Sequence, residues 1–208
     1  MNNPCTFYIV RHAESEANIQ KRYAGNFDAP LTENGHLQAQ EMAKQFKNIH
    51  FDAAFSSDLS RSYNTAQIIA NEHTVAVVAK KLLREKSHGI VEGKRHDELE
   101  EDIRKKMDVY HALDADAMWT HKAVEGMESL EETAGRFITF LRETALAYPN
   151  KTLLIVSHGG SMRSLLAHLG FASIKELPST SAANASYIVL KSDGVEFEIA
   201  KIVGIEKK

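Results

Sequence analysis

Apolar positions along this chain follow two patterns that alternate from one segment to the next. Short continuous apolar runs predict buried strands, and longer segments with apolar residues three or four apart predict helices. Strands and helices in alternation are typical of an α/β fold with a largely parallel sheet. The strand-like runs cover residues 6–10, 51–55, 75–78 and 152–156, and a β-hairpin is predicted over 186–190 and 195–203.

Residues that can cap a helix stand in front of the helical segments. Ser129 and Glu132 form a capping-box signature before the clearest of these segments, which Pro149 ends. With helices able to cover both faces of the sheet, we predict a three-layer α/β/α sandwich. Three more helices are expected, one capped by Thr32, one capped by Asp58, and one over 161–169.

Residues from about 84 to 128 interrupt this alternation. The segment is polar, carries charges of both signs, and holds one amphipathic helical pattern around Met107. We interpret it as an excursion inserted into a single domain that spans 1–208. It is expected to cover the C-terminal edge of the strands and to face the substrate.

Composition limits the classes of partner. The chain has 208 residues, 43% of them hydrophobic and 25% charged, which is ordinary for a globular protein. A net charge of −3 does not favour nucleic acid or a membrane surface as the main partner. Cys5 is the only cysteine, which excludes an internal disulfide and a thiolate metal site. No apolar stretch approaches the ~20 residues of a membrane span, so we expect a cytoplasmic protein, with the oligomeric state left open.

Histidines follow two of the predicted strands directly. Arg11 and His12 follow the first apolar run, and Ser157 and His158 follow the last long one. The C-terminal ends of parallel strands meet at the edge where α/β sheets bind ligands, so we expect the two histidines to lie together. A guanidinium can grip a phosphate with two hydrogen bonds, and a neutral imidazole can accept a phosphoryl group. The pairing predicts phosphate chemistry, although an exposed loop could carry Arg11 and His12 as well.

Further polar residues are expected near the same edge. Arg61 follows the second predicted strand and can add a cation, although a solvated helix arginine would look the same. Asn18, in the loop after the first strand, can donate to a phosphate oxygen. Gly159 and Gly160 precede a predicted helix whose N-terminal N–H groups would cradle an anion. Glu85 stands between two basic residues, which by itself is typical of a surface charge.

In combination, these motifs resemble the histidine phosphatase superfamily, which includes the cofactor-dependent phosphoglycerate mutases. The resemblance covers nearly the whole chain. It is carried by Arg11-His12-Ala13-Glu14, Asn18, Gly25 to Gly35, Ser56 to Arg61, Leu83-Arg84-Glu85 with Gly89 and Glu92-Gly93, and Ser157-His158-Gly159-Gly160 with Arg163. It implies that His12 forms a phosphohistidine and that Glu85 is the proton donor. It also implies a phosphate site made by Arg11, Arg61 and His158, with help from Asn18 and the Gly159 amide.

This chemistry sets expectations for protonation. The attacking nitrogen of His12 must be unprotonated, so we expect a backbone carbonyl to hold the other nitrogen. Arg11 and Arg61 should favour the neutral ring by charge repulsion. Glu85 must carry a proton, and burial beside a phosphate anion is expected to raise its pKa. No metal or other cofactor is expected, because the arginines and histidines supply the positive charge.

Two departures from the family pattern bear on the reaction. Ala13 stands where the family commonly has glycine, and residues 86–93 lack the Arg-His-Tyr-Gly pattern typical of the mutases. We therefore expect a metal-independent phosphomonoesterase that hydrolyses a small phosphorylated metabolite through a phosphohistidine. The alternatives are a phosphoglycerate mutase and a non-catalytic phospho-ligand-binding module on the same scaffold. The complete set of catalytic side chains argues against the binding module.

The identity of the substrate cannot be read from the residues. Tyr23 and Phe27 are expected to contact it, and His88 and His96 are placed at its border. The remaining histidines, His111 among them, are interpreted as surface or helix-face residues. The basic residues at 80, 81, 94 and 95 are interpreted as a solvated face.

Overall fold

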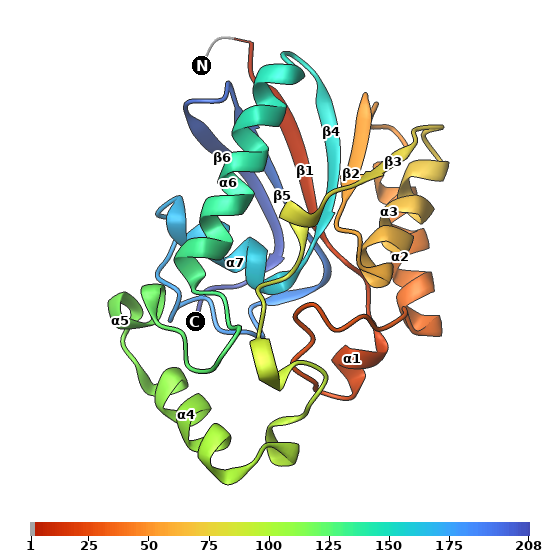
Figure 1. The fold of residues 1–208 in the computed structure, drawn as a ribbon. Coiled ribbons are helices and arrows are strands. Elements are labelled where there is room, and N and C mark those ends of the chain that lie inside the picture. The colour runs from red at the N-terminus through yellow and green to blue at the C-terminus, as the bar shows by residue number, and fades with distance from the viewer. Residues whose placement is uncertain (1–2) are drawn as a thin grey trace.

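A six-stranded sheet forms the centre of the computed structural model, which describes residues 3–208 (Figure 1). The strand order is β3-β2-β4-β1-β5-β6. The first four strands in this order run parallel, and β5 and β6 are antiparallel to their neighbours. The strands are β1 (Cys5–Arg11), β2 (Ala53–Ser56), β3 (Val77–Ala79), β4 (Thr152–Ser157), β5 (Ala182–Ser192) and β6 (Phe197–Ile205).

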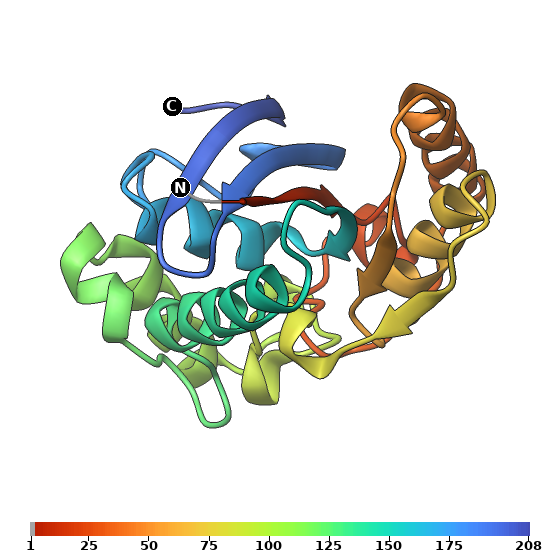
Figure 2. The same ribbon diagram turned by 90° about the horizontal axis from the view of Figure 1, so that it is seen from above.

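Helices cover both faces of the sheet, so the predicted three-layer sandwich is confirmed (Figure 2). Alternate residues of β1 point to opposite faces, as strand geometry requires. Phe7 and Ile9 pack in one apolar cluster with residues of α6 (Leu130–Ala147) and α7 (Gly159–His168). Val10 packs in the other cluster with residues of α2 (Glu33–Phe46) and α3 (Ser60–Asn71).

The polar excursion lies beyond the C-terminal ends of the parallel strands, where the sequence placed it (Figure 1). Its predicted amphipathic helix is α4 (Glu101–Ala112), and Met107 and Tyr110 are its buried residues. The other elements of this part of the chain are short: α5 (Ala115–Thr120) and the 3₁₀ turns η1 (Lys81–Leu83), η2 (Gly89–Val91) and η3 (His96–Glu98). One further short helix, α1 (Glu16–Ile19), follows β1.

Two of the three predicted helix caps are confirmed. The Thr32 hydroxyl accepts a hydrogen bond from the Gly35 N–H at 2.9 Å, and Ser129 and Glu132 form the capping box of α6. The Asp58 cap is wrong, because α3 begins one residue later, after Leu59, whose side chain makes no capping hydrogen bond. The Asp58 carboxylate instead accepts two hydrogen bonds from Arg84, at 2.6 and 2.8 Å.

The C-terminal hairpin is confirmed, with β5 longer than predicted and β6 beginning and ending two residues later than predicted. The β5 strand pairs with β1 on one side and with β6 on the other, both antiparallel. Its antiparallel direction brings the N-terminal part of β5 beside the C-terminal end of β1. Within residues 3–208, no helix is both long and apolar enough to cross a membrane.

Candidate active site

The two strand-end histidines meet, as the sequence predicted. In the parallel register of β1 and β4, Arg11 lies opposite Ser157, and the His12 N–H donates to the Ser157 carbonyl at 2.9 Å. The rings of His12 and His158 lie edge to face, with centroids 5.0 Å apart. Both side chains are buried, so their orientation is fixed by the surrounding structure.

A backbone carbonyl holds one nitrogen of His12, as expected. Nδ1 lies 2.7 Å from the carbonyl oxygen of Ala13, an acceptor, so Nδ1 carries the hydrogen and Nε2 keeps its lone pair. Burial lowers the pKa of His12 well below its ordinary value, and the charges of Arg61 and Arg11 lower it further. The side chain is therefore a neutral imidazole with an unprotonated nitrogen.

Arg11 and Arg61 bring positive charge to this ring from two different elements. The Arg61 side chain, in the first turn of α3, is fully buried and donates to the carbonyls of Gly25 and Phe27, each at 2.8 Å. Arg11 donates from Nη1 to the Ala182 carbonyl. The Nε atoms of both arginines and Nδ1 of His158 are buried and have no hydrogen-bond partner among the described residues. Buried donors of this kind are expected to find partners, and a bound anion would supply them.

The Asn18 side chain has its donor end free. Its Oδ1 accepts from the Ser15 N–H at 3.1 Å, which fixes the amide orientation because a backbone N–H can only donate. Oδ1 also accepts from Asn184 at 3.1 Å, and Asn184 donates to the His12 carbonyl at the same distance. The Asn18 Nδ2 can therefore donate to a phosphate oxygen, as the sequence suggested.

Glu85 occupies the N-terminus of α7, which corrects the predicted anion cradle. The helix begins at Gly159, two residues earlier than expected, and the N–H groups of Gly160 and Ser161 each donate to the Glu85 carboxylate at 2.9 Å. Of the two glycine amides, only that of Gly159 is left for a substrate anion. Gly159 also lets Arg11 approach, since a Cβ at this position would lie 3.1 Å from Arg11 Nε.

In the free protein the pKa of Glu85 is lowered, so the rise expected beside a bound phosphate anion stays a prediction. Burial acts to raise this pKa, but the N–H groups of Gly160 and Lys86 and the charges of His88 and Arg61 outweigh it. The pKa therefore lies below its ordinary value, and the carboxylate is ionised in the absence of substrate. The N-terminus of α7 stabilises the negative charge of the carboxylate, which is the physical reason for the lowered pKa of Glu85.

Hydrogen bonds from α6 and α7 hold the segment that carries Glu85. Arg136 of α6 donates to the carbonyls of Leu82, Arg84 and Glu85 at 2.7 to 2.9 Å. The Ser161 hydroxyl donates to the Arg84 carbonyl at 2.8 Å. The position of the carboxylate is therefore set by two helices of the sandwich, although the segment itself is irregular.

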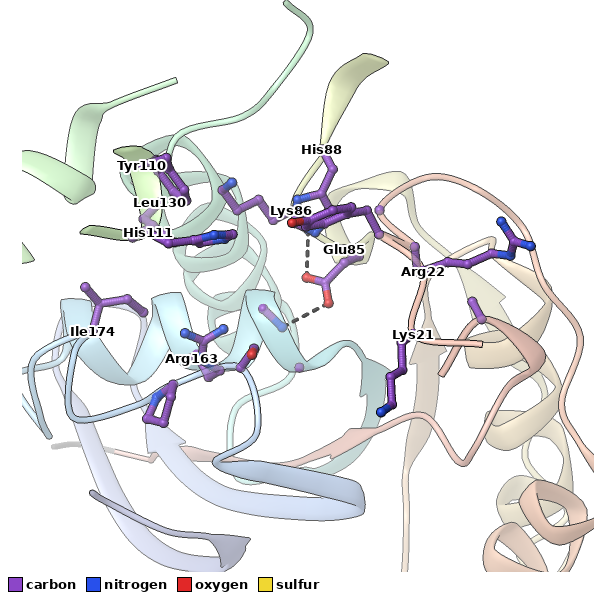
Figure 3. Close-up of a pocket in the computed structure, with 18 of the residues that line it drawn as sticks. Lys21, Arg22, Glu85, Lys86, His88, Tyr110, His111, Leu130, Arg163 and Ile174 are labelled. Atoms are coloured by element: carbon purple, nitrogen blue, oxygen red, sulfur yellow. Dashed lines mark hydrogen bonds between the residues drawn. The ribbon is translucent and has the colours of Figure 1, made fainter. Parts of the chain in front are cut away.

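A cavity of about 600 Å³ opens above these groups, between the excursion and the C-terminal ends of the strands (Figure 3). Arg11, Asn18, Glu85 and Gly159 line it, together with Tyr23, which was predicted to contact substrate. His88 and His96 border it as expected. His111, an exposed residue of α4 as the sequence predicted, borders it as well.

Phe27 does not line this cavity. Its side chain is 43% exposed and its ring packs against Gly93, so the residue contributes to the site through its carbonyl rather than its ring. Residues 80, 81, 94 and 95 are absent from the cavity wall, which agrees with their interpretation as a solvated face. In the described part of the chain, no group of three or more His, Cys, Asp or Glu side chains could hold a metal ion.

Several residues of the site were given no role from the sequence, although Ser57 and Arg163 lie in motifs that carry the family resemblance. The Ser57 hydroxyl lies 2.7 Å from Nε2 of His158, and Ser57 directly follows β2, so the strand-end rule could have found it. Asn184 escaped that rule because it lies near the start of an antiparallel strand. Lys86 and Arg163 also line the cavity, but the residues around them in the sequence do not indicate this role.

The site combines a neutral imidazole, buried cations and a carboxylate. Arg11 and Glu85 line the cavity, whereas the buried His12, Arg61 and His158 are not among its lining residues. Comparison with known proteins supplies the context. A family model described as the histidine phosphatase superfamily, branch 1, matches residues 7–203. The chain belongs to this superfamily. The resemblance predicted from the motifs is thereby confirmed, and the protein is a phosphoryl-transfer enzyme of the phosphatase and mutase group.

Relatives with both kinds of name are similar to this histidine phosphatase superfamily member. Phosphoserine phosphatase 1 from Hydrogenobacter thermophilus is 33% identical over 186 residues, covering 88% of this chain and 84% of the relative. A 2,3-bisphosphoglycerate-dependent phosphoglycerate mutase from Cytophaga hutchinsonii is 31% identical, covering 86% and 83%. Among solved structures, YhfR from Bacillus stearothermophilus has a TM-score of 0.80 at 27% identity, covering 94% of this chain and 95% of that one.

Proposed function

We propose that this protein is a metal-independent phosphomonoesterase that hydrolyses a small phosphorylated metabolite through a phosphohistidine on His12. The observation that carries the proposal is the hydrogen bond from His12 Nδ1 to the Ala13 carbonyl, which leaves Nε2 as a nucleophile. The names of the relatives, phosphoserine phosphatase and phosphoglycerate mutase, support a small phosphorylated substrate.

In the first step, Nε2 of His12 attacks phosphorus in line with the ester oxygen, and the phosphorus–oxygen bond breaks as the phosphorus–nitrogen bond forms. Arg11, Arg61 and His158 stabilise the charge on the three non-bridging oxygens, assisted by Asn18 and the Gly159 N–H. Charge-assisted hydrogen bonds contribute about 1.5–3 kcal/mol each, so the arginines outweigh the neutral donors. These cations supply the positive charge that a metal ion provides in other phosphoryl-transfer sites.

Glu85 moves the protons. It gives a proton to the leaving alkoxide, then takes one from the water that attacks the phosphohistidine, and phosphate leaves as the phosphorus–nitrogen bond breaks. Its lowered pKa in the free protein means that it must gain a proton when substrate binds. A phosphate dianion beside the carboxylate acts in this direction, because a neighbouring like charge raises the pKa of a carboxylate.

Hydrolysis is favoured over mutase activity by the segment after Glu85. Residues 86–93 lack the Arg-His-Tyr-Gly pattern of the mutases. A mutase must also retain the leaving group and rephosphorylate it, whereas a phosphatase releases the alcohol and admits water. One relative is nevertheless named a mutase, so the test must include both reactions.

The experiment is phosphate release from a panel of phosphomonoesters in EDTA, with wild type and His12→Ala in parallel. The panel includes p-nitrophenyl phosphate, phosphoserine, 3-phosphoglycerate and sugar phosphates, and 3-phosphoglycerate is also assayed for conversion to 2-phosphoglycerate. We expect release by wild type alone. Interconversion without release would indicate a mutase, and release that needs a metal ion or survives His12→Ala would contradict the proposal.

A further inference from the structure

The cavity that Arg11 and Gly159 of the proposed phosphate site line carries an excess of positive charge. Its lining includes one carboxylate, Glu85, which the N-terminus of α7 already neutralises in part. Six basic side chains also line it: Arg11, Lys21, Arg22, Lys86, Arg163 and Lys175. Of these, Arg22 is paired with Glu98 at 2.9 Å. Arg11 belongs to the phosphate site, so it does not explain the cations farther from His12.

Lys86 is the most unusual of these cations. It is only 4% exposed, and its Nζ lies 5.1 Å from the centre of the Tyr110 ring. Its backbone N–H donates to Glu85 at 2.7 Å, but within residues 3–208 its Nζ forms no ion pair. Burial lowers its pKa to about 8, and the charges of Glu85 and Glu128 only partly oppose this effect. A buried ammonium without a paired anion is rare and costly in a folded protein.

Arg163, which is half-buried, stands across the cavity from Lys86 and also lacks a paired anion. It extends from α7, and Figure 3 shows its guanidinium and the Lys86 side chain reaching toward the part of the cavity that His111 borders. Its Nε donates to the Leu177 carbonyl, and within residues 3–208 it forms no ion pair. Burial lowers its pKa to about 10.

Another largely buried arginine shows what is missing at these two positions. Arg136 is also largely enclosed, but it forms an ion pair with Glu128 at 2.7 Å. Lys86 and Arg163 have no such counter-ion, yet both face a cavity large enough for a ligand. Beneath them the wall is apolar, formed by Tyr110, Met118, Leu130 and Ile174.

We propose that Lys86 and Arg163 form a second anion subsite, which binds a carboxylate or a second phosphate of a substrate whose reacting phosphate lies at His12. The inference deepens the proposed function by naming the substrate class, small phosphomonoesters with a second negative group, and it rests on that function. The ligand anion supplies the counter-charge that the chain lacks at this end of the cavity.

The test measures binding in the His12→Ala background, so that turnover does not consume the ligands. Calorimetry compares 3-phosphoglycerate with glycerol 3-phosphate, which differ by a carboxylate, and fructose 1,6-bisphosphate with fructose 6-phosphate, which differ by a phosphate. Lys86→Met and Arg163→Met each remove one charge from the subsite. Lys105→Met is the matched control, because Lys105 is an exposed lysine of α4 that pairs with Glu101.

We expect at least one of the two ligands with a second anionic group, 3-phosphoglycerate or fructose 1,6-bisphosphate, to bind about 10- to 100-fold more tightly than its partner. Lys86→Met and Arg163→Met should each remove most of that preference, with a far smaller effect on the partner ligand, and Lys105→Met should change neither. The pair that shows the preference identifies the second anion as carboxylate or phosphate. Equal affinities within both pairs of ligands, or equal losses for both members of a pair in the variants, would overturn the subsite.

Failure of the proposed function has a different signature. It would appear as absence of phosphate release from every ester by wild type, p-nitrophenyl phosphate included, whatever the binding data show. If Lys86→Met does not fold, Lys86→Gln takes its place. The ligand comparison in the His12→Ala protein needs neither variant, because Lys86 and Arg163 are intact in it. Equal affinities for the two members of both ligand pairs in that protein are sufficient to reject the subsite.

Discussion

The Glu85 carboxylate lies over the first turn of α7, where the Gly160 N–H donates to it at 2.9 Å. A Cβ on Gly160 would lie 2.5 Å from Glu85 Oε1, so this close approach requires glycine. The contact stabilises the ionised carboxylate, whereas the proposed reaction needs its protonated form. The proposed proton donor, Glu85, is therefore held by the helix that directly follows His158.

Proton uptake on anion binding should follow from this arrangement. Because the pKa of Glu85 is lowered in the free protein, a dianion bound beside it should raise that pKa and draw in a proton. Sulfate is a suitable probe, since it does not itself titrate near neutral pH. Calorimetry at pH 5.5 in buffers with different ionisation enthalpies should show less proton uptake for Glu85→Gln than for wild type. Identical uptake in the two proteins would mean that Glu85 does not titrate with ligand.

Substitution of Gly160 by alanine should displace the carboxylate without unfolding the protein. We expect Gly160→Ala to lower kcat for alkyl phosphates by about 10- to 100-fold, within the range typical of lost general acid catalysis. Gly135→Ala is the control, because Gly135 lies in α6 with nothing within 4 Å of an added Cβ. The control should keep full activity and gain about 0.5–1 kcal/mol in the free energy of unfolding. Unchanged kcat in Gly160→Ala would show that the carboxylate position is not critical.

The acid role of Glu85 should depend on the leaving group. Glu85→Gln keeps the size of the side chain but cannot supply the proton, so hydrolysis of an alkyl phosphate should slow by about 10²- to 10⁴-fold. Hydrolysis of p-nitrophenyl phosphate, whose leaving group needs little protonation, should slow much less. The measurement is the steady-state kcat of wild type and Glu85→Gln for the two esters. An equal decrease in kcat for both esters would show that Glu85 is not the general acid.

Stability should decrease as the pH falls below about 6.5. Burial lowers the pKa values of His12 and His158, so in this range the unfolded chain binds more protons than the folded protein. The direction follows from linkage, because protons then favour the unfolded state. Urea unfolding at pH 7.5 and 5.5 should show this loss, and His12→Gln should reduce it by up to about 1.4 kcal/mol. A pH dependence that does not change in His12→Gln would mean that His12 titrates normally in the folded protein.

Much of the fold was predictable because its signals are local. Continuous apolar runs identified β1, β2 and β4, and the Ser129 capping box identified the start of α6. Asp58 was misassigned because its residue type suits both a helix cap and an ion pair, and the pairing with Arg84 joins positions far apart in the sequence.

The site was predictable where the topology alone determines it. The parallel strand β1 ends at Arg11 and is followed by His12, and β4 is followed by His158. These three side chains therefore come together as soon as β1 and β4 pair. The protonation of Glu85 was not predictable, since it depends on which N–H groups of α7 the carboxylate reaches. The cavity-facing position of Lys86 was also not predictable, because adjacent charges in a polar segment look the same whether they face solvent or a cavity. Arg163 lies in α7, where a single charged residue indicates no ligand site by itself.

The most direct test of the account is detection of the covalent intermediate. Wild type is mixed with a phosphomonoester labelled in its phosphate, quenched within milliseconds, and digested for peptide mapping. We predict an acid-labile, base-stable phosphoryl group on the peptide that contains His12, absent from His12→Ala and longer-lived in Glu85→Gln. A catalytically active enzyme that releases phosphate without any label on His12, or that carries the label on another residue, would contradict the central claim.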